Sequence, residues 1–491
     1  MIGVILVALV ILYLTYELYW KRRNLPPGPT PLPLFGNLLD VMKNSPGYEA
    51  FRKWSKKYGP VYTYWLGTMP VVVVSDYETL KETVIKDGDK YAGRWIFEDF
   101  IKDTKGGLFG LVFSEGDLWR EQRRLTLHTL RDFGMGRNIM EERVMVEVDF
   151  LLEKMAKQDD IRIQAELDLA VGSVINGILF GYRFDEDHEH EYRLVKNSLR
   201  DFVKAGSSPL FTVACISSLI RQIPPFKGAY ANILAPNDVL YNFIRKQIAA
   251  KRKQVDFDSE TSNDFVESYL KEWERKKGTP QGEFYFERQL EALIFDIWTA
   301  GQDTTSNTIA WTIAYILHHP KVEEKIHEEL DRVIKSDRKI TLADKNSLPY
   351  VNAVISESQR LTNLLPLNVP RRTTENVVIN GYKLPADTLV VPQICCVMYD
   401  EKVFPDPYKF DPSRFLNLDG SLKTYPELIP FSIGKRSCPG EGMAKVELYL
   451  FIANIFQRFK VSAKKLPSLE KELNNVVIPK TFTCQVESRH R

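Results

Sequence analysis

The stretch Phe431-Ser432-Ile433-Gly434-Lys435-Arg436-Ser437-Cys438-Pro439-Gly440 contains a lone cysteine, with an arginine two residues before it and a glycine on each side. Gly434 can adopt a positive φ, and successive amides around such a turn can point at one anion. A helix expected from about residue 442 to 459 would add its positive N-terminal end. We therefore expect Cys438 to be a thiolate that ligates a metal.

One thiolate suits haem iron better than zinc. Structural zinc needs four clustered ligands, and we expect His188 and His190 to lie in a solvated loop. The sequence HEEL at 327–330 lacks the second histidine of a metalloprotease helix. In haem the macrocycle supplies four in-plane ligands, so a single cysteine can complete the site.

The spacing F-x-x-G-x-R-x-C-x-G in this stretch resembles the signature of the cytochromes P450. The resemblance extends from the proline-rich segment near residue 26 to the C-terminal strands. It is nearest to the animal microsomal members of family two, which oxidise drugs and fatty acids. It implies haem b as the cofactor, Cys438 as its axial iron ligand, Phe431 and Gly434 as haem-binding positions, and Arg436 as a partner of a haem propionate.

Other segments match further propionate-binding positions of that family. Trp119 and Arg123 in WREQRR are four residues apart, so on one helix both can reach the same partner. The resemblance assigns them to haem propionate, together with Arg94 in YAGRW and Arg371 in VPRR. Charge-assisted bonds from several arginines hold a dianionic cofactor well. Any one of these arginines alone is more commonly a surface residue.

A structural network is expected beside the haem. Glu357 and Arg360 in ISESQR are three residues apart and share a helix face. Alone, they would be read as a weak surface pair. Arg414 in FDPSRF stands where the family completes a buried Glu-Arg-Arg network, although Ser413 replaces a glutamate often found there. The resemblance implies a structural role on the proximal side of the haem, not a catalytic one.

The segment Ala300-Gly301-Gln302-Asp303-Thr304-Thr305 matches the family motif A-G-x-[D/E]-T-[T/S], in a helix expected from about residue 287 to 317. The Thr304 hydroxyl can bond the Ala300 carbonyl and disturb the helical ladder. We expect a kink there that opens a groove for dioxygen and water. Asp303 and Thr304 are the predicted catalytic residues, which would relay protons. An ordinary threonine pair in a helix is the alternative.

The resemblance alone predicts the substrate pocket. Its residues are mostly apolar, which suits fatty acids or lipophilic foreign compounds, and the sequence does not choose between these. They are Ile96, Phe97, Leu111, Phe113, Phe295, Trp298, Ala300, Leu367, Val369 and Val477.

The patterns along the chain predict a mainly α fold with small β-sheets, which is that of the cytochromes P450. A hairpin is expected from Val61–Leu66 and Val71–Val74, helices from about residue 117 to 333, and short strands after Pro366. The formal net charge of +2 lacks the basic excess of a nucleic-acid binder. Five cysteines without framework spacing favour a reducing compartment.

The first twenty residues read as an uncleaved membrane anchor. Residues 2–20 could cover roughly 28 Å as a helix, close to the thickness of a bilayer core. Lys21, Arg22 and Arg23 follow it, which predicts a single transmembrane helix with the rest of the chain in the cytosol. The resemblance to microsomal members implies that the membrane is that of the endoplasmic reticulum. The expected division is 1–20 anchor, 21–33 basic stop-transfer and proline-rich hinge, and 34–491 haem-thiolate domain. The apolar segment 210–235 is either core or a second membrane contact.

Together these features predict a monooxygenase that inserts one atom of dioxygen into a lipophilic substrate. The sequence has no G-x-G-x-x-G segment or flavin segment, so electrons must come from another protein. The resemblance implies NADPH–cytochrome P450 reductase, with cytochrome b5 as an optional second donor. Two alternatives are a P450 that rearranges peroxides without external electrons, which needs no proton relay, and a non-catalytic haem sensor.

A basic stripe is the predicted docking surface for the reductase. On a helix from residue 119 to 133, Arg120, Arg124 and Arg131 fall within roughly 40° of one another. Lys435 and Arg137 would extend the stripe. Such a surface suits the docking of an acidic flavin domain, while a solvated helix face is the alternative.

Overall fold

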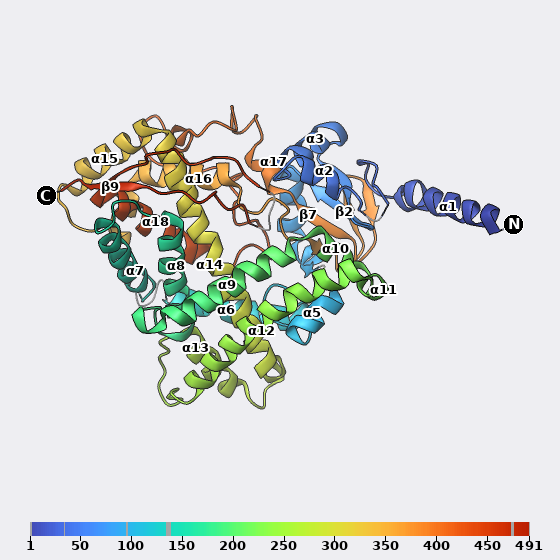
Figure 1. The fold of residues 1–491 in the computed structure, drawn as a ribbon, viewed down its shortest axis with the longest axis horizontal. Helices are drawn as coiled ribbons and strands as arrows, with labels where there is room; N and C mark the ends of the chain where they lie inside the picture. Colours follow the sequence, from blue (N-terminus) through green and yellow to red (C-terminus); the bar gives the residue numbers. More distant parts are fainter. Residues whose placement is uncertain (1, 34, 95–96, 134–138, 473–475, 491) are drawn as a thin grey trace.

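The computed structural model describes residues 2–33, 35–94, 97–133, 139–472 and 476–490. It is mainly helical with small sheets, as the sequence predicts. Figure 1 shows a sheet-containing region beside a larger helical body, with α1 projecting beyond the sheet and the C-terminus on the opposite side.

The helices follow the predicted spans closely. The long helix expected from residue 287 to 317 is α14, Glu287–His318, and the last helix is α18, Glu441–Arg458. The remaining α-helices are α1 (Ile2–Leu18), α2 (Leu38–Lys43), α3 (Tyr48–Tyr58), α4 (Tyr77–Leu80), α5 (Glu98–Lys105), α6 (Gly116–Arg131), α7 (Ile139–Ala156), α8 (Ile163–Phe180), α9 (Glu189–Gly206), α10 (Pro209–Ile216), α11 (Ser218–Arg221), α12 (Pro224–Arg252), α13 (Phe265–Lys276), α15 (Pro320–Ile334), α16 (Pro349–Thr362) and α17 (Ile394–Met398).

The largest sheet has the strand order β1-β2-β7-β4-β3, in which only β2 and β7 run parallel. Two small antiparallel pairs, β5-β6 and β8-β9, stand apart from it. The strands are β1 (Val61–Leu66), β2 (Met69–Val74), β3 (Gly93–Arg94), β4 (Arg371–Arg372), β5 (Val377–Ile379), β6 (Tyr382–Leu384), β7 (Leu389–Pro392), β8 (Phe459–Ser462) and β9 (Gln485–Ser488).

The predicted hairpin is β1-β2, and its four valines explain its place in the fold. Val71 to Val74 are completely buried, so both faces of β2 are covered. Val71 and Val73 join the main core, while Val72 and Val74 pack in a second cluster. This alternation follows from the two-residue period of a strand. The hairpin therefore joins the sheet to the helical body.

Helix α14 runs through the helical body, in contact with α8, α12, α16 and α18. Most of its side chains are buried, but Ala300 is exposed and Asp303 and Thr304 are half-buried. The helix is continuous from Glu287 to His318. One face of its middle turn therefore borders open space, which is where the sequence places the oxygen-binding groove.

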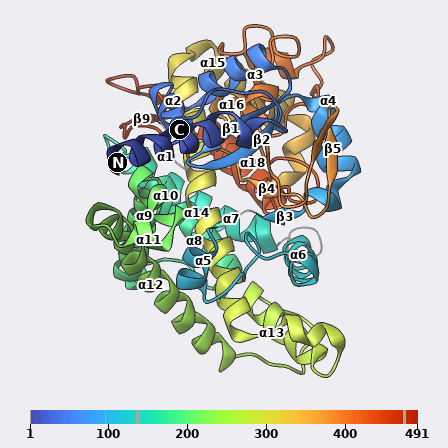
Figure 2. The same cartoon turned by 90° about the vertical axis from the view of Figure 1, so that its right-hand side faces the viewer.

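Among the described residues, two helices are long and apolar enough to cross a membrane. The span Gly3–Arg22 is 0% buried, whereas Ile163–Phe180 is 67% buried and belongs to the core. The region of α10 and α11 lies on the same side of the body as α1 in both views (Figures 1 and 2). Leu210, Leu219 and Ile223 are exposed there, so part of the apolar segment 210–235 is surface rather than core.

A buried carboxyl in the body yields a prediction on pH and stability. Glu447 of α18 is 1% exposed, and burial raises its pKa to about 8, against an opposing hydrogen bond from Thr305 of α14. Between its unfolded pKa and pH 8 the folded chain therefore retains a proton that the unfolded chain releases. This lowers the free energy of unfolding by up to about 1.4 kcal/mol for each pH unit.

We expect Glu447→Gln to remove that dependence, because glutamine resembles the protonated acid. From pH 6 to 7.5 the variant's Tm should rise by a few degrees relative to wild type, as followed by differential scanning fluorimetry. A constant Tm difference across this range would show that Glu447 is ionised in the folded chain.

Candidate functional site

The loop before α18 holds Cys438 in a closely fitted turn. The Cys438 amide donates to the Phe431 carbonyl at 2.9 Å, and the Ser437 amide donates to the Gly434 carbonyl at 2.9 Å. Gly434 has φ +74°, and a Cβ there would lie 1.9 Å from the Val84 carbonyl oxygen. Glycine is therefore required at this position by both conformation and space.

The Cys438 side chain is accessible to solvent, although the surrounding protein desolvates its thiol. Burial raises the pKa of its thiol, while hydrogen bonds from the Gly440 and Glu441 amides and the charge of Arg123 act in the opposite direction. The expected amide cradle is thus present. Among the protein's own groups, desolvation outweighs the amides and Arg123, so these groups alone do not set the thiolate. A bound cation would reverse that balance.

Four arginines converge near this loop from separate elements. Arg94 in β3 pairs in register with Arg371 in β4, and Arg123 in α6 donates to the Ser437 carbonyl at 2.8 Å. Arg436 donates to the carbonyls of Ala92 and Ser114, each at 2.7 Å. These hydrogen bonds fix the guanidinium groups against the backbone.

Burial and mutual repulsion make the arginine cluster a favourable place for an anion. Burial first, then repulsion from neighbouring arginines, lowers the pKa of Arg94 to about 10, that of Arg371 to about 9 and that of Arg436 to about 8. Burial also lowers the pKa of Arg123. The nearby carboxylate of Glu115 is ion-paired with Arg372. A dianionic ligand would relieve this repulsion.

Two unpartnered donors support the same conclusion. Trp119 is 4% exposed and its indole Nε1 lacks a hydrogen-bond partner among the described residues, as does one terminal nitrogen of Arg371. The Arg436 guanidinium lies 3.9 Å from the Trp119 ring. Buried donors are rarely left unpaired in folded proteins. The residues therefore fit a haem, whose two propionates would accept these bonds while Cys438 holds the iron.

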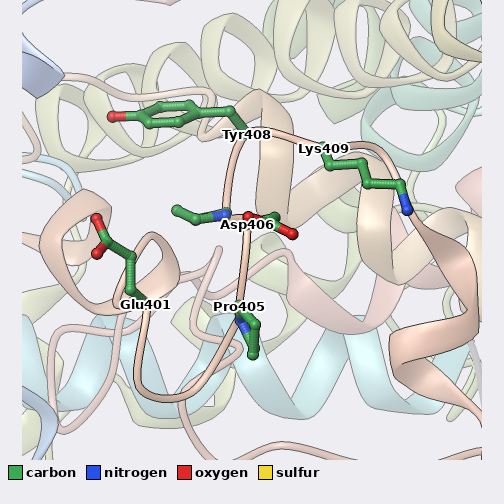
Figure 3. A pocket seen from close by; sticks show the side chains of 6 residues that line it. Glu401, Pro405, Asp406, Tyr408 and Lys409 are labelled. Atoms are coloured by element: carbon green, nitrogen blue, oxygen red, sulfur yellow. The ribbon is translucent and has the colours of Figure 1, made fainter.

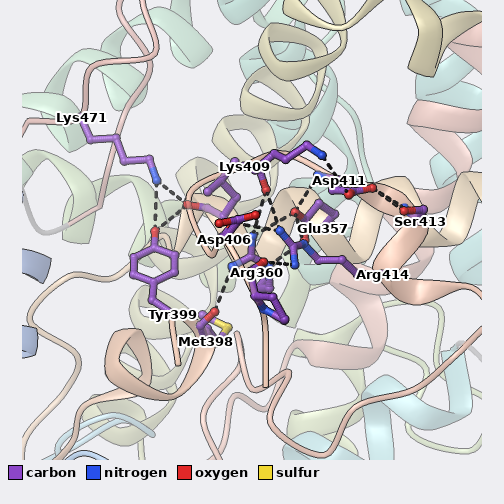
Figure 4. Close-up of polar contacts among 12 residues, drawn as sticks. Glu357, Arg360, Met398, Tyr399, Asp406, Lys409, Asp411, Ser413, Arg414 and Lys471 are labelled. Carbon is purple, nitrogen blue, oxygen red and sulfur yellow. Dashed lines mark hydrogen bonds and ion pairs between the residues drawn. The ribbon is translucent and has the colours of Figure 1, made fainter. Parts of the chain in front are cut away.

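The predicted structural network is present behind the site (Figure 4). Arg360 donates to Glu357 through two bonds of 2.6 and 2.9 Å, and both side chains are completely buried. Arg414 Nε lies 3.4 Å from Glu357 Oε1 as an ion pair without hydrogen-bond geometry. The Asp411 amide completes the shell of Glu357 at 2.9 Å. The network ties α16 to the loop that precedes the cysteine.

On the opposite side of the expected haem, Thr304 donates to the Ala300 carbonyl at 2.8 Å, as predicted. Thr308 and Thr312 make the same bond one and two turns later, at 2.7 and 2.8 Å. The bond itself therefore does not distinguish Thr304. What distinguishes it is its position beside the exposed Ala300 on the open face of α14.

Asp303 lies in an ion-pair cluster rather than beside the Thr304 hydroxyl. Lys196 of α9 contacts Asp303 Oδ1 at 2.5 Å and Asp168 Oδ1 at 3.3 Å, and the Ser306 hydroxyl donates to Asp168 at 2.7 Å. Burial lowers the pKa of Lys196, but the two carboxylates outweigh it and raise that pKa overall. Lys196 therefore stays charged and holds Asp303 toward α9.

Lys105 contacts two of the predicted pocket residues. Its side chain is 3% exposed and forms an ion pair with Asp296 of α14. Its ammonium lies 5.2 Å from the Phe113 ring and 5.4 Å from the Phe295 ring. The Leu111 amide donates to the same Asp296 at 2.7 Å. This pair fixes the segment before α6 against α14.

The other predicted pocket residues are divided between surface and core. Ala300 and Val369 are exposed and Leu367 is half-buried, whereas Trp298 and Val477 are completely buried. Phe97 packs beside the cluster of α10 and α12. Ile96 lies outside the described residues. A cavity of about 460 Å³ lies elsewhere, between Glu401 and the loop 405–409, and contains none of the predicted site residues (Figure 3).

Comparison with known proteins agrees with this geometry. The family model described as Cytochrome P450 matches residues 26–486. The chain belongs to the cytochrome P450 family. This P450 is accordingly an oxidoreductase of the monooxygenase type, and its family implies a haem cofactor.

Curated relatives cover nearly the whole P450 chain. Cytochrome P450 2H1 of Gallus gallus is 35% identical over 91% of this chain and 89% of its own length. Cytochrome P450 2C3 of Oryctolagus cuniculus is 34% identical over 98% and 97%. Cytochrome P450 2C29 of Mus musculus is 37% identical over 90% and 89%.

Several basic residues of the predicted stripe of this P450 form ion pairs with acidic neighbours. Arg124 contacts Glu121 at 2.7 Å, and Arg120 contacts Asp117 one turn back on α6. Lys435 lies 3.5 Å from Asp89. Arg131 is exposed, and Arg137 lies outside the described residues. The expectation of a wholly basic surface is therefore wrong, because α6 also presents acidic residues to its arginines.

The sequence reading missed Lys196, Asp168, Lys105 and Asp296. All four are buried or half-buried charges on helices. Asp296 and Lys196 could have been noticed as charges within otherwise apolar helix faces. Their partners could not have been found in this way, because each ion pair joins elements far apart in the chain.

The buried network supports a stability prediction. Arg360→Met leaves Glu357 buried without its principal partner, which we expect to lower the free energy of unfolding by about 3–5 kcal/mol and to reduce the haem retained per chain. The matched control is Arg193→Met, which breaks the exposed pair with Glu189 and should change stability by at most about 1 kcal/mol. Urea unfolding curves compare the two. An equal loss of unfolding free energy in the two variants would mean that the buried network stabilises the fold no more than an exposed ion pair does.

Proposed function

We propose that this P450 is a haem-thiolate monooxygenase anchored in the endoplasmic reticulum membrane, with its catalytic domain in the cytosol. It inserts one atom of dioxygen into lipophilic substrates such as fatty acids or xenobiotics. The observation that carries this proposal is the convergence of four arginines from separate elements beside the exposed side chain of Cys438. The proposed division remains 1–20 anchor, 21–33 hinge and 34–491 catalytic domain.

The residues of the site have distinct roles in this proposal. Cys438 would hold the haem iron, in a loop shaped by Phe431 and Gly434. Arg94, Trp119, Arg123, Arg371 and Arg436 would bind the propionates. When bound, the haem supplies an iron that binds and reduces dioxygen. Glu357, Arg360 and Arg414 keep the proximal loop in place and do not take part in the chemistry.

Thr304 and Asp303 act on the opposite side as proton-handling groups. The Thr304 hydroxyl borders the open face of α14, so it can orient water there and pass on a proton. Asp303 is half-buried and held by Lys196. In this geometry Lys196 governs how far the Asp303 carboxylate can turn toward the open face. Asp303 is therefore proposed as a relay that depends on the position of Lys196.

The electron donor is proposed to be NADPH–cytochrome P450 reductase, with cytochrome b5 as an optional second donor. Support comes from the absence of a nicotinamide- or flavin-binding sequence motif in the chain. The exposed apolar helix α1 supports the membrane anchor, and the mostly apolar composition of the predicted pocket residues supports a lipophilic substrate. The proposal involves no nucleic acid.

The first test is a spectrum combined with turnover. Cys438→Ser should abolish the strongly red-shifted absorption band of the reduced carbon-monoxide complex and the NADPH-dependent product formation supported by added reductase. Cys215→Ser, a change at a buried cysteine of α10, should retain both. An unchanged band in Cys438→Ser would falsify the ligand assignment. Product formed from peroxide substrates without reductase would favour the peroxide-rearranging alternative.

The second test concerns Thr304. Thr304→Ala should keep haem and substrate binding but lower the ratio of product to NADPH consumed by about tenfold or more, with release of hydrogen peroxide. Thr308→Ala removes a hydroxyl with the same backbone bond one turn away and should leave this ratio near wild type. Equal loss in both variants would mean that the hydroxyls act on helix geometry, not on protons.

A further inference from the structure

A second cavity lies where the anchor helix meets the sheet. It has a volume of about 310 Å³ and is lined by Tyr19, Arg22, Arg23, the segment 25–28, and Thr63 and Trp65 of β1. This volume is at the lower end of the range for small-molecule sites. Nothing in the proposed monooxygenase chemistry uses these residues.

Contacts between the anchor and the hairpin hold the cavity open. Lys21 Nζ donates to the Thr68 carbonyl at 2.8 Å and lies 4.9 Å from the Trp65 ring. Arg22 donates to the Gly28 carbonyl at 3.0 Å. A Cβ on Gly28 would lie 1.8 Å from the Thr63 carbonyl oxygen, so only glycine permits this approach. Specific contacts of the folded chain therefore position the walls of the cavity.

The charge in the cavity is positive and uncompensated. Lys21 is paired with Glu17 at 3.1 Å. Within the described part of the chain, neither Arg22 nor Arg23 forms an ion pair with an acidic side chain. Arg23 lies 5.6 Å from the Trp20 ring, which leaves its donors directed to solvent or ligand. Two adjacent guanidinium groups of this kind suit a phosphate.

The wall opposite the arginines offers an unsatisfied hydroxyl. Tyr62 and Tyr64 of β1 face the main core, so Thr63 and Trp65 face the other way, toward the cavity. Thr63 is 3% exposed, and its Oγ1 has no hydrogen-bond partner among the described residues. A buried hydroxyl without a partner is costly, which points to a ligand atom that fills this role.

We propose that this cavity binds the headgroup of one anionic phospholipid, with its phosphate on Arg22 and Arg23 and a polar headgroup atom on Thr63. The proposal rests on the membrane anchor proposed above. If α1 crosses the bilayer, Tyr19 and Trp20 lie in the aromatic belt, and the cavity lies at the level of the headgroups. Tyr19 and Trp65 are the aromatic residues of the cavity lining. The bound lipid would then contact both the anchor helix and the catalytic body and limit their relative movement.

The test uses full-length protein in mild detergent, titrated with short-chain phosphatidylserine or phosphatidylcholine, with bound lipid counted by native mass spectrometry. Wild type should retain one phosphatidylserine with at least about tenfold preference over phosphatidylcholine. Arg22→Gln with Arg23→Gln should weaken binding by about tenfold or more, and Thr63→Val by about threefold. Lys157→Gln with Lys253→Gln removes the same charge from distant, exposed sites and should bind as wild type.

Equal retention of both lipids, or wild-type binding by the double arginine variant, would overturn the headgroup site. Displacement of phosphatidylserine by millimolar inorganic phosphate would also overturn it, since the cavity would then select free phosphate and not a lipid. Flotation of the full-length chain with purely zwitterionic vesicles tests the anchor separately. Loss of flotation would refute the anchor, whereas flotation without lipid selectivity would refute only the headgroup site.

Discussion

The structure depends on bringing four arginine charges together, three of them buried and that of Arg123 half-buried. Arg94, Arg123, Arg371 and Arg436 come from β3, α6, β4 and the cysteine loop, so their convergence fixes how the sheet, the helical body and the loop sit together. Like charges in a low-dielectric interior repel strongly, and backbone carbonyls offset only part of that cost. The haem that the family implies would therefore stabilise the junction of these regions as well as supply the chemistry.

Features set by short-range sequence could be predicted well. The run of valines gives β2, the apolar spacing gives the full extent of α14, and Gly434 marks the turn that presents Cys438. The arginines were found through family spacing, since each lies at a fixed offset within a recognisable segment. In all these cases a few neighbouring residues determine the local geometry, and the family resemblance supplies the way they assemble.

Long-range electrostatics could not be predicted in the same way. Asp303 is held by Lys196, which is more than one hundred residues away in the chain. Lys105 forms an ion pair with Asp296, which is also more than one hundred residues away. The α6 stripe carries mixed charge, because Asp117 and Glu121, each about one turn away, pair with Arg120 and Arg124. Likewise, the Cys438 cradle was read from its amides alone, although desolvation outweighs them. In each case a three-dimensional neighbour or the loss of water decided the outcome.

The parallel pairing of β2 with β7 has a consequence for how the chain is made. It joins residues 71–74 to residues 389–392, so the sheet cannot close until about three hundred further residues have left the ribosome. At typical elongation rates this takes about 15–60 s. During that interval the valine-rich edge of β2 has no partner and would favour pairing with other chains. If α1 anchors the chain in a bilayer, as proposed, the hairpin is held close to the membrane and meets fewer such chains, which would limit aggregation during synthesis.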